Sequence, residues 1–280
     1  MPSITDLKEE LDDLVTMKSI TSALTEASAG RLQKIRASFE RNVQVYQEIS
    51  NIYHLVRISY FKMKTGQQVK LPTLELKNLS VAVTSNQRFY GNINNVIMRR
   101  FVEKTQKERT DLMVIGLTGQ SYMKIASFGR QYESFSFQKD TATQEESARF
   151  IEKTAQYDQI FLYFPKFVSL VNQTVGITDI TQTAAPEGGE KDEIKILFEP
   201  ELPKIVDFFN RQVRRLLFIR IMLETDLSLT AARLLSMSAA EERSEDLIKE
   251  KKSEVRKTMS SIINAQLLET FSSIGSWREE

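Results

Sequence analysis

The sequence predicts an α/β protein in which an antiparallel coiled coil of long N- and C-terminal helices carries a central three-layer α/β domain. Between Pro203 and Gly275 the chain contains no Gly or Pro, and before Gly66 it contains only Pro2 and Gly30. Both ends carry apolar residues every three or four positions, whereas the middle alternates β-branched runs with amphipathic segments. A long helix cannot bury an apolar stripe against itself, so the two ends are expected to pair.

The first element is expected to be a helix over residues 1–66. Ser3, Thr5 and Asp6 follow Pro2 and offer side chains that cap a helix start. The spacing of the apolar residues is typical of a coiled-coil face, and its register slips by one step near Gly30. The predicted stripe comprises Leu7, Leu11, Leu14, Met17, Ile20, Leu24, Ala27, Leu32, Ile35, Phe39, Val43, Tyr46, Ile49, Tyr53 and Val56.

The middle of the chain, residues 75–200, is expected to form the α/β domain. Strand composition is found at 79–84, 111–117, 157–163, 167–178 and 194–198, and helical patterns at 92–107, 119–128 and 145–156. A polar stretch with Pro186, Gly188 and Gly189 predicts a mobile loop over 181–193. Strands that alternate with helices favour a parallel sheet between two helical layers, which is a Rossmann-like three-layer arrangement.

The last element is expected to be a second coiled-coil helix over residues 201–280. Its predicted stripe comprises Ile205, Phe208, Gln212, Leu216, Ile219, Leu223, Leu227, Ala231, Leu234, Met237, Val255, Met259, Ile262, Gln266 and Glu269. The stretch from Glu241 to Glu254 is mostly charged and is expected to be solvated or to face polar partners.

Composition excludes several classes of protein. The 38 basic and 37 acidic residues are balanced, so there is no basic excess of the kind that marks a nucleic-acid-binding protein. No apolar run of about 20 residues is present, so we expect no direct membrane insertion. The start of the chain does not resemble a signal peptide, and cysteine is absent, which excludes disulfides and thiolate metal sites. A soluble cytosolic protein, linked to a membrane only through a partner, fits these features.

No catalytic, cofactor-binding or metal-binding residues are predicted. The turn from Gly116 to Gly119 lies where a phosphate would bind, but the full glycine fingerprint and a P-loop Lys are missing, so a structural turn is expected. The polar turn around Asn86 could bind an anion and is more typical of a structural turn. The single His54 lies on a predicted helix, so neither a metal site nor a Ser-His-Asp set can be built around it.

Several short motifs, in order, resemble the gamma subunit of F-type rotary ATP synthases over nearly the whole chain. Ile20–Leu24 and Ala27–Leu32 are similar to the I-T-x-A-M and V-A-A-S-K-L segments of that family, and Thr84–Asn94 is similar to its S-D-x-G-L-C-G-G-F-N turn. Phe198-Glu199-Pro200 resembles its Y-E-P, and Ala231–Met237 with Ala239-Ala240 and Leu247-Ile248 resembles its A-A-R-M-x-A-M region.

The chain also departs from the family. The turn has lost the Asp and the first Gly of S-D-x-G. Near the C-terminus, the Y-N, R-Q and I-T-x-E of the family correspond to Val255-Arg256, Met259-Ser260 and Ile263-Asn264-Ala265-Gln266. The polar residues with which the family contacts the catalytic subunits are therefore largely missing. ATP synthesis and ATP hydrolysis both remain open as the direction in which the motor would operate.

The resemblance implies a mechanical function: a central rotor shaft that couples ion flow through the membrane ring to conformational change in the catalytic ring. It implies alpha and beta subunits as partners around the shaft, an epsilon-type subunit and the membrane c-ring as partners of the α/β domain, and a place at the cytoplasmic face of the cell membrane. The chain itself would be non-catalytic and without cofactor. The expected contacts with the alpha/beta ring are Ile20, Thr21, Leu24, Arg31, Arg233, Met237, Ile263, Gln266 and Glu269.

Three alternatives remain at this level. The chain could be the shaft of an F-type-like motor that is not used for ATP synthesis. It could be a coiled-coil scaffold with an α/β head, which would purify as a solitary dimer. It could also be a nucleotide-binding enzyme, against which the incomplete glycine fingerprint argues.

Overall fold

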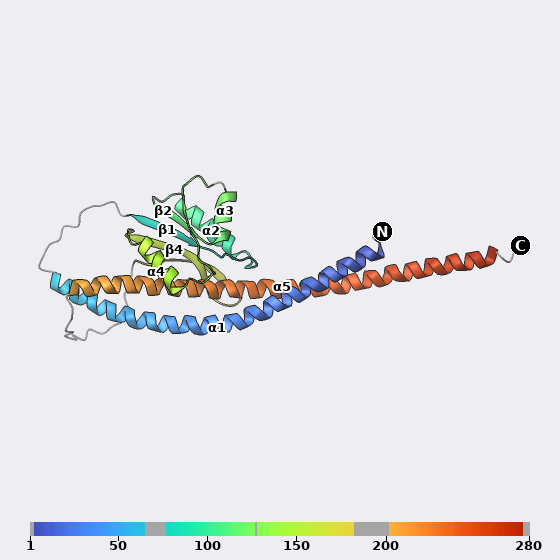
Figure 1. The fold of residues 1–280 in the computed structure, drawn as a ribbon, viewed down its shortest axis with the longest axis horizontal. Coiled ribbons are helices and arrows are strands. Elements are labelled where there is room, and N and C mark those ends of the chain that lie inside the picture. The colour runs from blue at the N-terminus through green and yellow to red at the C-terminus, as the bar shows by residue number, and fades with distance from the viewer. Residues whose placement is uncertain (1–2, 65–76, 127, 182–201, 277–280) are drawn as a thin grey trace. The chain divides into compact units, whose positions relative to one another are not determined.

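The computed structural model describes residues 3–64, 77–126, 128–181 and 202–276 (Figure 1). The predicted strand over 194–198 and most of the predicted loop before it lie outside these residues. The elements are α1 (Ile4–Lys64), β1 (Asn78–Val83), α2 (Ile93–Thr105), β2 (Asp111–Ile115), α3 (Leu117–Ile125), β3 (Glu133–Phe135), α4 (Gln144–Lys153), β4 (Gln159–Phe167), β5 (Gln173–Asp179) and α5 (Leu202–Ser276).

Contacts divide the chain into two compact units. One unit, here called the helix-pair unit, consists of Met1–Ala29 and Leu234–Glu280. The other, the domain unit, runs from Gly30 to Arg233 and contains the sheet together with parts of both long helices.

The domain unit is built on a five-stranded sheet with the strand order β3-β2-β1-β4-β5. The pairs β1–β2, β1–β4 and β2–β3 are parallel, as the alternation of strands and helices predicted. The edge strand β5 departs from the predicted parallel arrangement, because it pairs antiparallel with β4. Only residues 168–172 separate these two strands, and a parallel return needs a crossover of about a dozen residues or more.

Helices cover both faces of the sheet, which confirms the three-layer arrangement. On one face, Ile97 and Phe101 of α2 and Met123 of α3 pack against Val114 and its neighbours. On the other face lie α4 and the parts of α1 and α5 that belong to this unit. There the rings of Phe150 in α4 and Phe218 in α5 stack with centroids 4.2 Å apart.

The short strand β3 was not predicted from the sequence. It contains only three residues, and none of them is fully buried. A strand of this length shows no measurable alternation, so it exists because the exposed edge of β2 is available for pairing rather than because of its own pattern.

In the helix-pair unit, α1 and α5 run antiparallel, since Lys18 pairs with Glu245 at 3.3 Å and Glu10 with Lys251 at 2.6 Å. The prediction placed the buried stripe of α1 through Met17, Ile20 and Ala27, and this part of it was wrong: Met17 and Ile20 are 52% and 56% exposed, and Ala27 is exposed as well. Among the side chains of this unit that the structure describes, the buried ones are Leu7, Thr21, Ser28, Met237, Ser244 and Ile248.

Thr21 and Ser244 can take buried positions because their hydroxyl groups are satisfied within their own helices. Thr21 Oγ1 donates to the carbonyl oxygens of Met17 and Lys18, and Ser244 Oγ donates to that of Ala240. Five stripe residues predicted for α5 are also exposed: Phe208, Met259, Ile262, Gln266 and Glu269.

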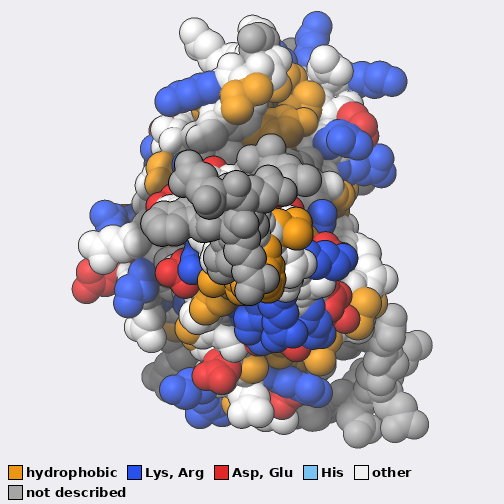
Figure 2. Space-filling model, turned by 90° about the vertical axis from the view of Figure 1, so that its right-hand side faces the viewer, with side chains coloured by type: hydrophobic (Ala, Val, Ile, Leu, Met, Phe, Trp, Pro, Cys, Tyr) orange, Lys and Arg blue, Asp and Glu red, His pale blue; other side chains and the backbone are white. Residues whose placement is uncertain are grey.

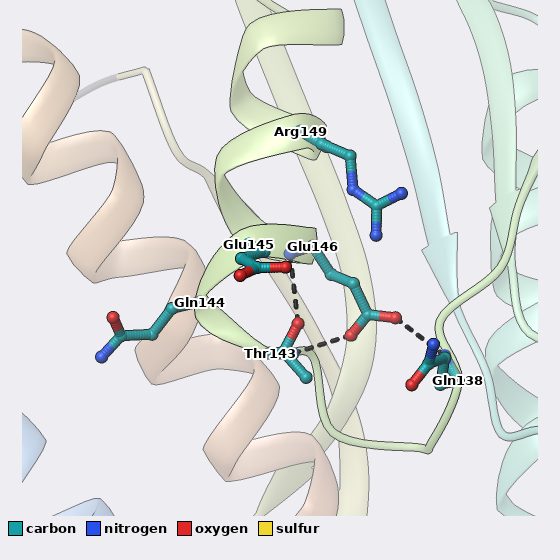
Figure 3. A pocket seen from close by; sticks show the side chains of 6 residues that line it. All are labelled: Gln138, Thr143, Gln144, Glu145, Glu146 and Arg149. Carbon is teal, nitrogen blue, oxygen red and sulfur yellow. Dashed lines mark hydrogen bonds between the residues drawn. The ribbon is translucent and has the colours of Figure 1, made fainter.

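The start of α4 shows how polar groups are satisfied in the domain unit (Figure 3). Thr143 and Glu146 form a capping box in which each side chain accepts from the other's backbone N–H. Glu146 also accepts from the N–H of Gln138 at 2.9 Å. Burial alone would raise the pKa of Glu146, but the N–H groups of Thr143 and Gln138 outweigh it and lower that pKa.

Replacing Glu146 with Gln is expected to lower the free energy of unfolding by about 1 kcal/mol near neutral pH, because two N–H groups lose a charged acceptor. A lowered folded-state pKa stabilises the fold above the ordinary Glu pKa, and this contribution is lost as the pH falls through the folded-state value. Urea unfolding at neutral pH and at about pH 3 should therefore show a difference that shrinks in acid. The exposed Glu145→Gln is the matched control, and an equal loss in both variants would contradict the assignment.

Candidate functional site at the junction of the long helices and the sheet

The carboxyl ends of the parallel strands are the place where open α/β sheets bind ligands. In this chain the loop 84–92, which follows β1, lies there and caps the start of α3. The first three N–H groups of α3 each donate to an oxygen of this loop: Leu117 to Asn86 Oδ1 at 3.2 Å, Thr118 to Ser85 O at 3.1 Å, and Gly119 to Thr84 Oγ1 at 2.9 Å. The N–H groups that a phosphate would use are therefore already satisfied.

The turn at Gly116 is shaped by the same contact. Gly116 has φ +96°, and a Cβ there would lie 2.2 Å from Thr84 O. A Cβ on Gly119 would lie 2.6 Å from Thr84 Oγ1. Both glycines thus allow a close approach between two segments of the backbone, which is the structural turn expected from the sequence.

Arg233 of α5 holds the loop after β1. Its Nη2 donates to Gln87 Oε1 at 2.9 Å and to Arg88 O at 3.0 Å. The guanidinium lies 4.2 Å from the centre of the Tyr90 ring, within cation–π distance. The polar turn around Asn86 is in this way occupied by a cation of the chain itself.

Tyr90 and Asp140 form the next contact. The Tyr90 hydroxyl donates to Asp140 Oδ2 at 2.6 Å, and the N–H of Asn86 donates to Asp140 Oδ1 at 2.6 Å. Burial and the hydrogen bond to Asp140 raise the pKa of Tyr90 far above its usual range. The phenol therefore stays protonated and remains a donor. Phe89, beside it, has φ +71°, a backbone conformation that non-glycine residues seldom adopt.

Asp226 of α5 joins this edge of the sheet to α1. Its Oδ1 accepts from Arg31 Nη2 at 2.8 Å, and its Oδ2 accepts from Thr141 Oγ1 at 2.9 Å. The Asp226 side chain is only 5% exposed. Burial alone would lower the pKa of Arg31, but the adjacent carboxylate outweighs it and raises that pKa. We call this cluster the polar clasp; it comprises Arg31, Tyr90, Asp140, Thr141, Asp226 and Arg233.

The structure places the nine residues predicted to contact a surrounding ring in two groups. Arg31 and Arg233 belong to the polar clasp in the domain unit. The other seven belong to the helix-pair unit, where Thr21 and Met237 are buried, Leu24 is half-buried, and the exposed side chains are those of Ile20, Ile263, Gln266 and Glu269. Whether any of them contacts a ring stays a prediction.

The sequence did not single out Tyr90, Asp140, Thr141 or Asp226 as members of a site. The sequence shows a cluster of polar residues around Asp226, at Glu224, Thr225, Ser228 and Thr230. Only the structure shows that this cluster is buried. Asp226 binds Thr141 and Arg31, which are distant from it in the chain and could not be inferred from spacing.

The part of the chain that the structure describes has no candidate metal site. No group of three or more His, Asp or Glu side chains there is placed to hold a metal ion. The side chain of His54 lies outside the described ones. Of the helices described, none has the length and apolar character needed to cross a bilayer.

Gly116→Ala is expected to lower the free energy of unfolding by about 3 kcal/mol, because the new Cβ would meet Thr84 in a strained backbone conformation. Gly30→Ala is the control of opposite sign, since a Cβ at that helical position meets nothing within 4 Å. It should raise stability by about 0.5–1 kcal/mol. Urea unfolding followed by circular dichroism measures both, and a tolerated Gly116→Ala would refute the close approach.

Comparison with known proteins places the chain in a family. The model of the family described as ATP synthase matches residues 3–276. Among curated relatives, the ATP synthase gamma chain of Clostridium novyi is 22% identical, over 86% of this chain and 87% of its own length. That of Rubrobacter xylanophilus is 23% identical, over 89% of each chain.

Solved structures agree on the fold. A chain from the central stalk and c-ring structure of Tetrahymena thermophila mitochondrial ATP synthase is 18% identical with a TM-score of 0.59, over 79% of this chain and 99% of that one. A chain from the Euglena gracilis mitochondrial ATP synthase is 17% identical with a TM-score of 0.56, over 89% and 95%. With the family model matched from residue 3 to residue 276, the chain belongs to the ATP synthase gamma-chain family.

Proposed function

We propose that this chain is the central rotor shaft of an F-type ATP synthase. In this role it couples ion flow through the membrane ring to conformational change in the catalytic alpha/beta ring, for ATP synthesis or hydrolysis. Family membership supports the assignment. The observation that carries the shaft role is that α1 and α5 form an antiparallel pair in the helix-pair unit. The relatives that match are gamma chains, and the structural neighbours come from central stalks and rotors.

The last described part of α5 extends beyond its partner helix (Figure 1). From Met259 to Ser272 every residue is exposed, including Ile263, Leu267 and Phe271, which are 46%, 50% and 69% exposed. A solitary helix with this much exposed apolar surface is typical of an interaction site. A sleeve formed by the alpha and beta subunits would cover it.

The predicted ring contacts divide between two roles under this proposal. Ile20, Ile263, Gln266 and Glu269, with the half-buried Leu24, would meet the alpha and beta subunits directly. Thr21 and Met237 would hold the two helices together from inside, and Arg31 and Arg233 would fix the helices to the α/β domain. Figure 2 shows side chains of both charges mixed with hydrophobic ones on the face that it draws. A mixed surface of this kind favours turning over tight binding at one angle.

The remaining assignments are part of the same proposal. An epsilon-type subunit and the membrane c-ring would contact the α/β domain, and the complex would lie at the cytoplasmic face of the cell membrane. The chain would be non-catalytic, since the chemistry would belong to the beta subunits. The self-capped start of α3 supports this over a nucleotide-binding enzyme, and a scaffold unrelated to the motor is not favoured because the family match covers both helices and the domain.

The purified chain is expected to hydrolyse no ATP, whereas a complex of alpha, beta and membrane subunits should pump ions at the expense of ATP only when the chain is added. Vesicles that contain the complex with and without it measure the requirement through ATP hydrolysis and ion uptake. Turnover by the chain alone, or equal pumping without it, would overturn the proposal.

Replacing Ile263 and Leu267 together with Lys is expected to weaken binding to the alpha/beta ring by at least about tenfold, or about 1.4 kcal/mol, because two apolar contacts are lost. The urea midpoint of the isolated chain should stay unchanged, since both side chains are exposed in it. Ser261→Lys, on the other side of the helix, is the matched control. Equal affinity in all three proteins would remove this segment from the ring contact.

A further inference from the structure

α5 carries a set of buried polar side chains within the domain unit. Glu224, Thr225, Asp226, Ser228 and Thr230 are all at most 8% exposed. Burying polar groups costs free energy unless each is paired, and apolar residues of similar volume often stabilise the same contact as well or better. A polar set at this position therefore supplies something that apolar packing does not.

Asp226 supplies directional hydrogen bonds. Apolar contact is non-directional and tolerates sliding of one surface over another. The two oxygens of Asp226, in contrast, hold separate partners at 2.8 and 2.9 Å, Arg31 on α1 and Thr141 on the loop before α4. Charge-assisted hydrogen bonds fix both the distance and the orientation of their partners. One carboxylate thus sets the positions of three segments.

The loop that carries Thr141 is itself anchored to the sheet. Asp140, the preceding residue, binds the Tyr90 hydroxyl and the N–H of Asn86 in the loop after β1. Asp226 is therefore connected, through Thr141 and the adjacent Asp140, to the loop at the carboxyl end of β1.

A second attachment lies further along α5. Arg233 follows Asp226 by roughly two helical turns, on nearly the same face and about 10 Å along the axis. Arg233 contacts the loop after β1 through Gln87, Arg88 and the Tyr90 ring. Two attachments separated along an axis resist rotation and tilt together, whereas one resists tilt poorly. Arg31 and Arg233 also lie at the two boundaries of the domain unit, which runs from Gly30 to Arg233.

We propose that Asp226 is a positioning residue for rotary coupling: through Arg31 and Thr141 it locks both long helices to the α/β domain, so that torque reaches both helices at one level. This inference rests on the proposed function. Asp226 takes no part in the chemistry of ATP, and its effect is transmitted through the groups it holds.

The test uses the complete complex reconstituted in vesicles and measures the ions pumped per ATP hydrolysed against an increasing opposing gradient. Asp226→Asn keeps the shape of the side chain and removes its charge. It should lower the ratio of ions to ATP, with a loss that grows as the opposing gradient rises. Thr141→Val is a milder variant on a partly exposed loop residue and should change the ratio in the same direction. Asp246→Asn, an exposed carboxylate on the same helix, is the matched control.

A double variant separates positioning from stability. Arg31→Met with Asp226→Leu replaces the ion pair by an apolar pair, which should restore the melting temperature lost in Asp226→Asn but not the directional contacts. The ratio of ions to ATP should stay low in it. A ratio restored to that of the parent, or one unchanged in Asp226→Asn and Thr141→Val, would overturn the inference. If complexes assembled without the chain pump ions as well as those that contain it, the proposed function itself would be refuted.

Discussion

The domain unit depends on the burial of α5 between Val213 and Ala232. Phe218, with no exposed surface, stacks on Phe150 and packs near Phe137, while Leu217, Ile221 and their neighbours cover one face of the sheet. Without this helix, the apolar side chains of β1 and β4 on that face would meet water. The sheet and the helix are therefore one core, although more than a hundred residues of sequence separate β1 from the part of α5 that covers it.

The polar contacts follow from this apolar one. Once α5 lies along the sheet, its continuation passes the carboxyl ends of the strands, where the loop after β1 and the loop before α4 leave the layer. The same edge serves many α/β proteins as a ligand site because N–H groups and loops converge there. In this chain, side chains of the chain itself fill those positions, so the geometry of a binding site is used to fasten one element to another.

The elements with strong periodicity or composition could be predicted from the sequence. The two long helices follow from the scarcity of Gly and Pro at both ends of the chain, and β1 and β2 from their apolar, β-branched runs. The buried stripe of α1 was harder, because Thr21 and Ser28 look like surface residues and Met17 and Ile20 look like core residues. The polar clasp could not be predicted from the sequence, because Arg31, Asp226 and Thr141 meet only after the chain has folded.

The two units hold their helices very differently, and this difference has an elastic consequence. Between Val213 and Ala232, α5 packs against the sheet, a second helix and aromatic side chains, so a twist there must deform a close-packed core. In the helix-pair unit, α5 packs against α1 alone among the described elements, along a narrow seam whose buried side chains include serine and threonine. Beyond Thr258, none of the α5 side chains that the structure describes is buried. Under a twisting load, strain concentrates where the restoring contacts are fewest. The helix-pair unit is therefore the compliant part of the molecule, and the domain unit is the stiff one.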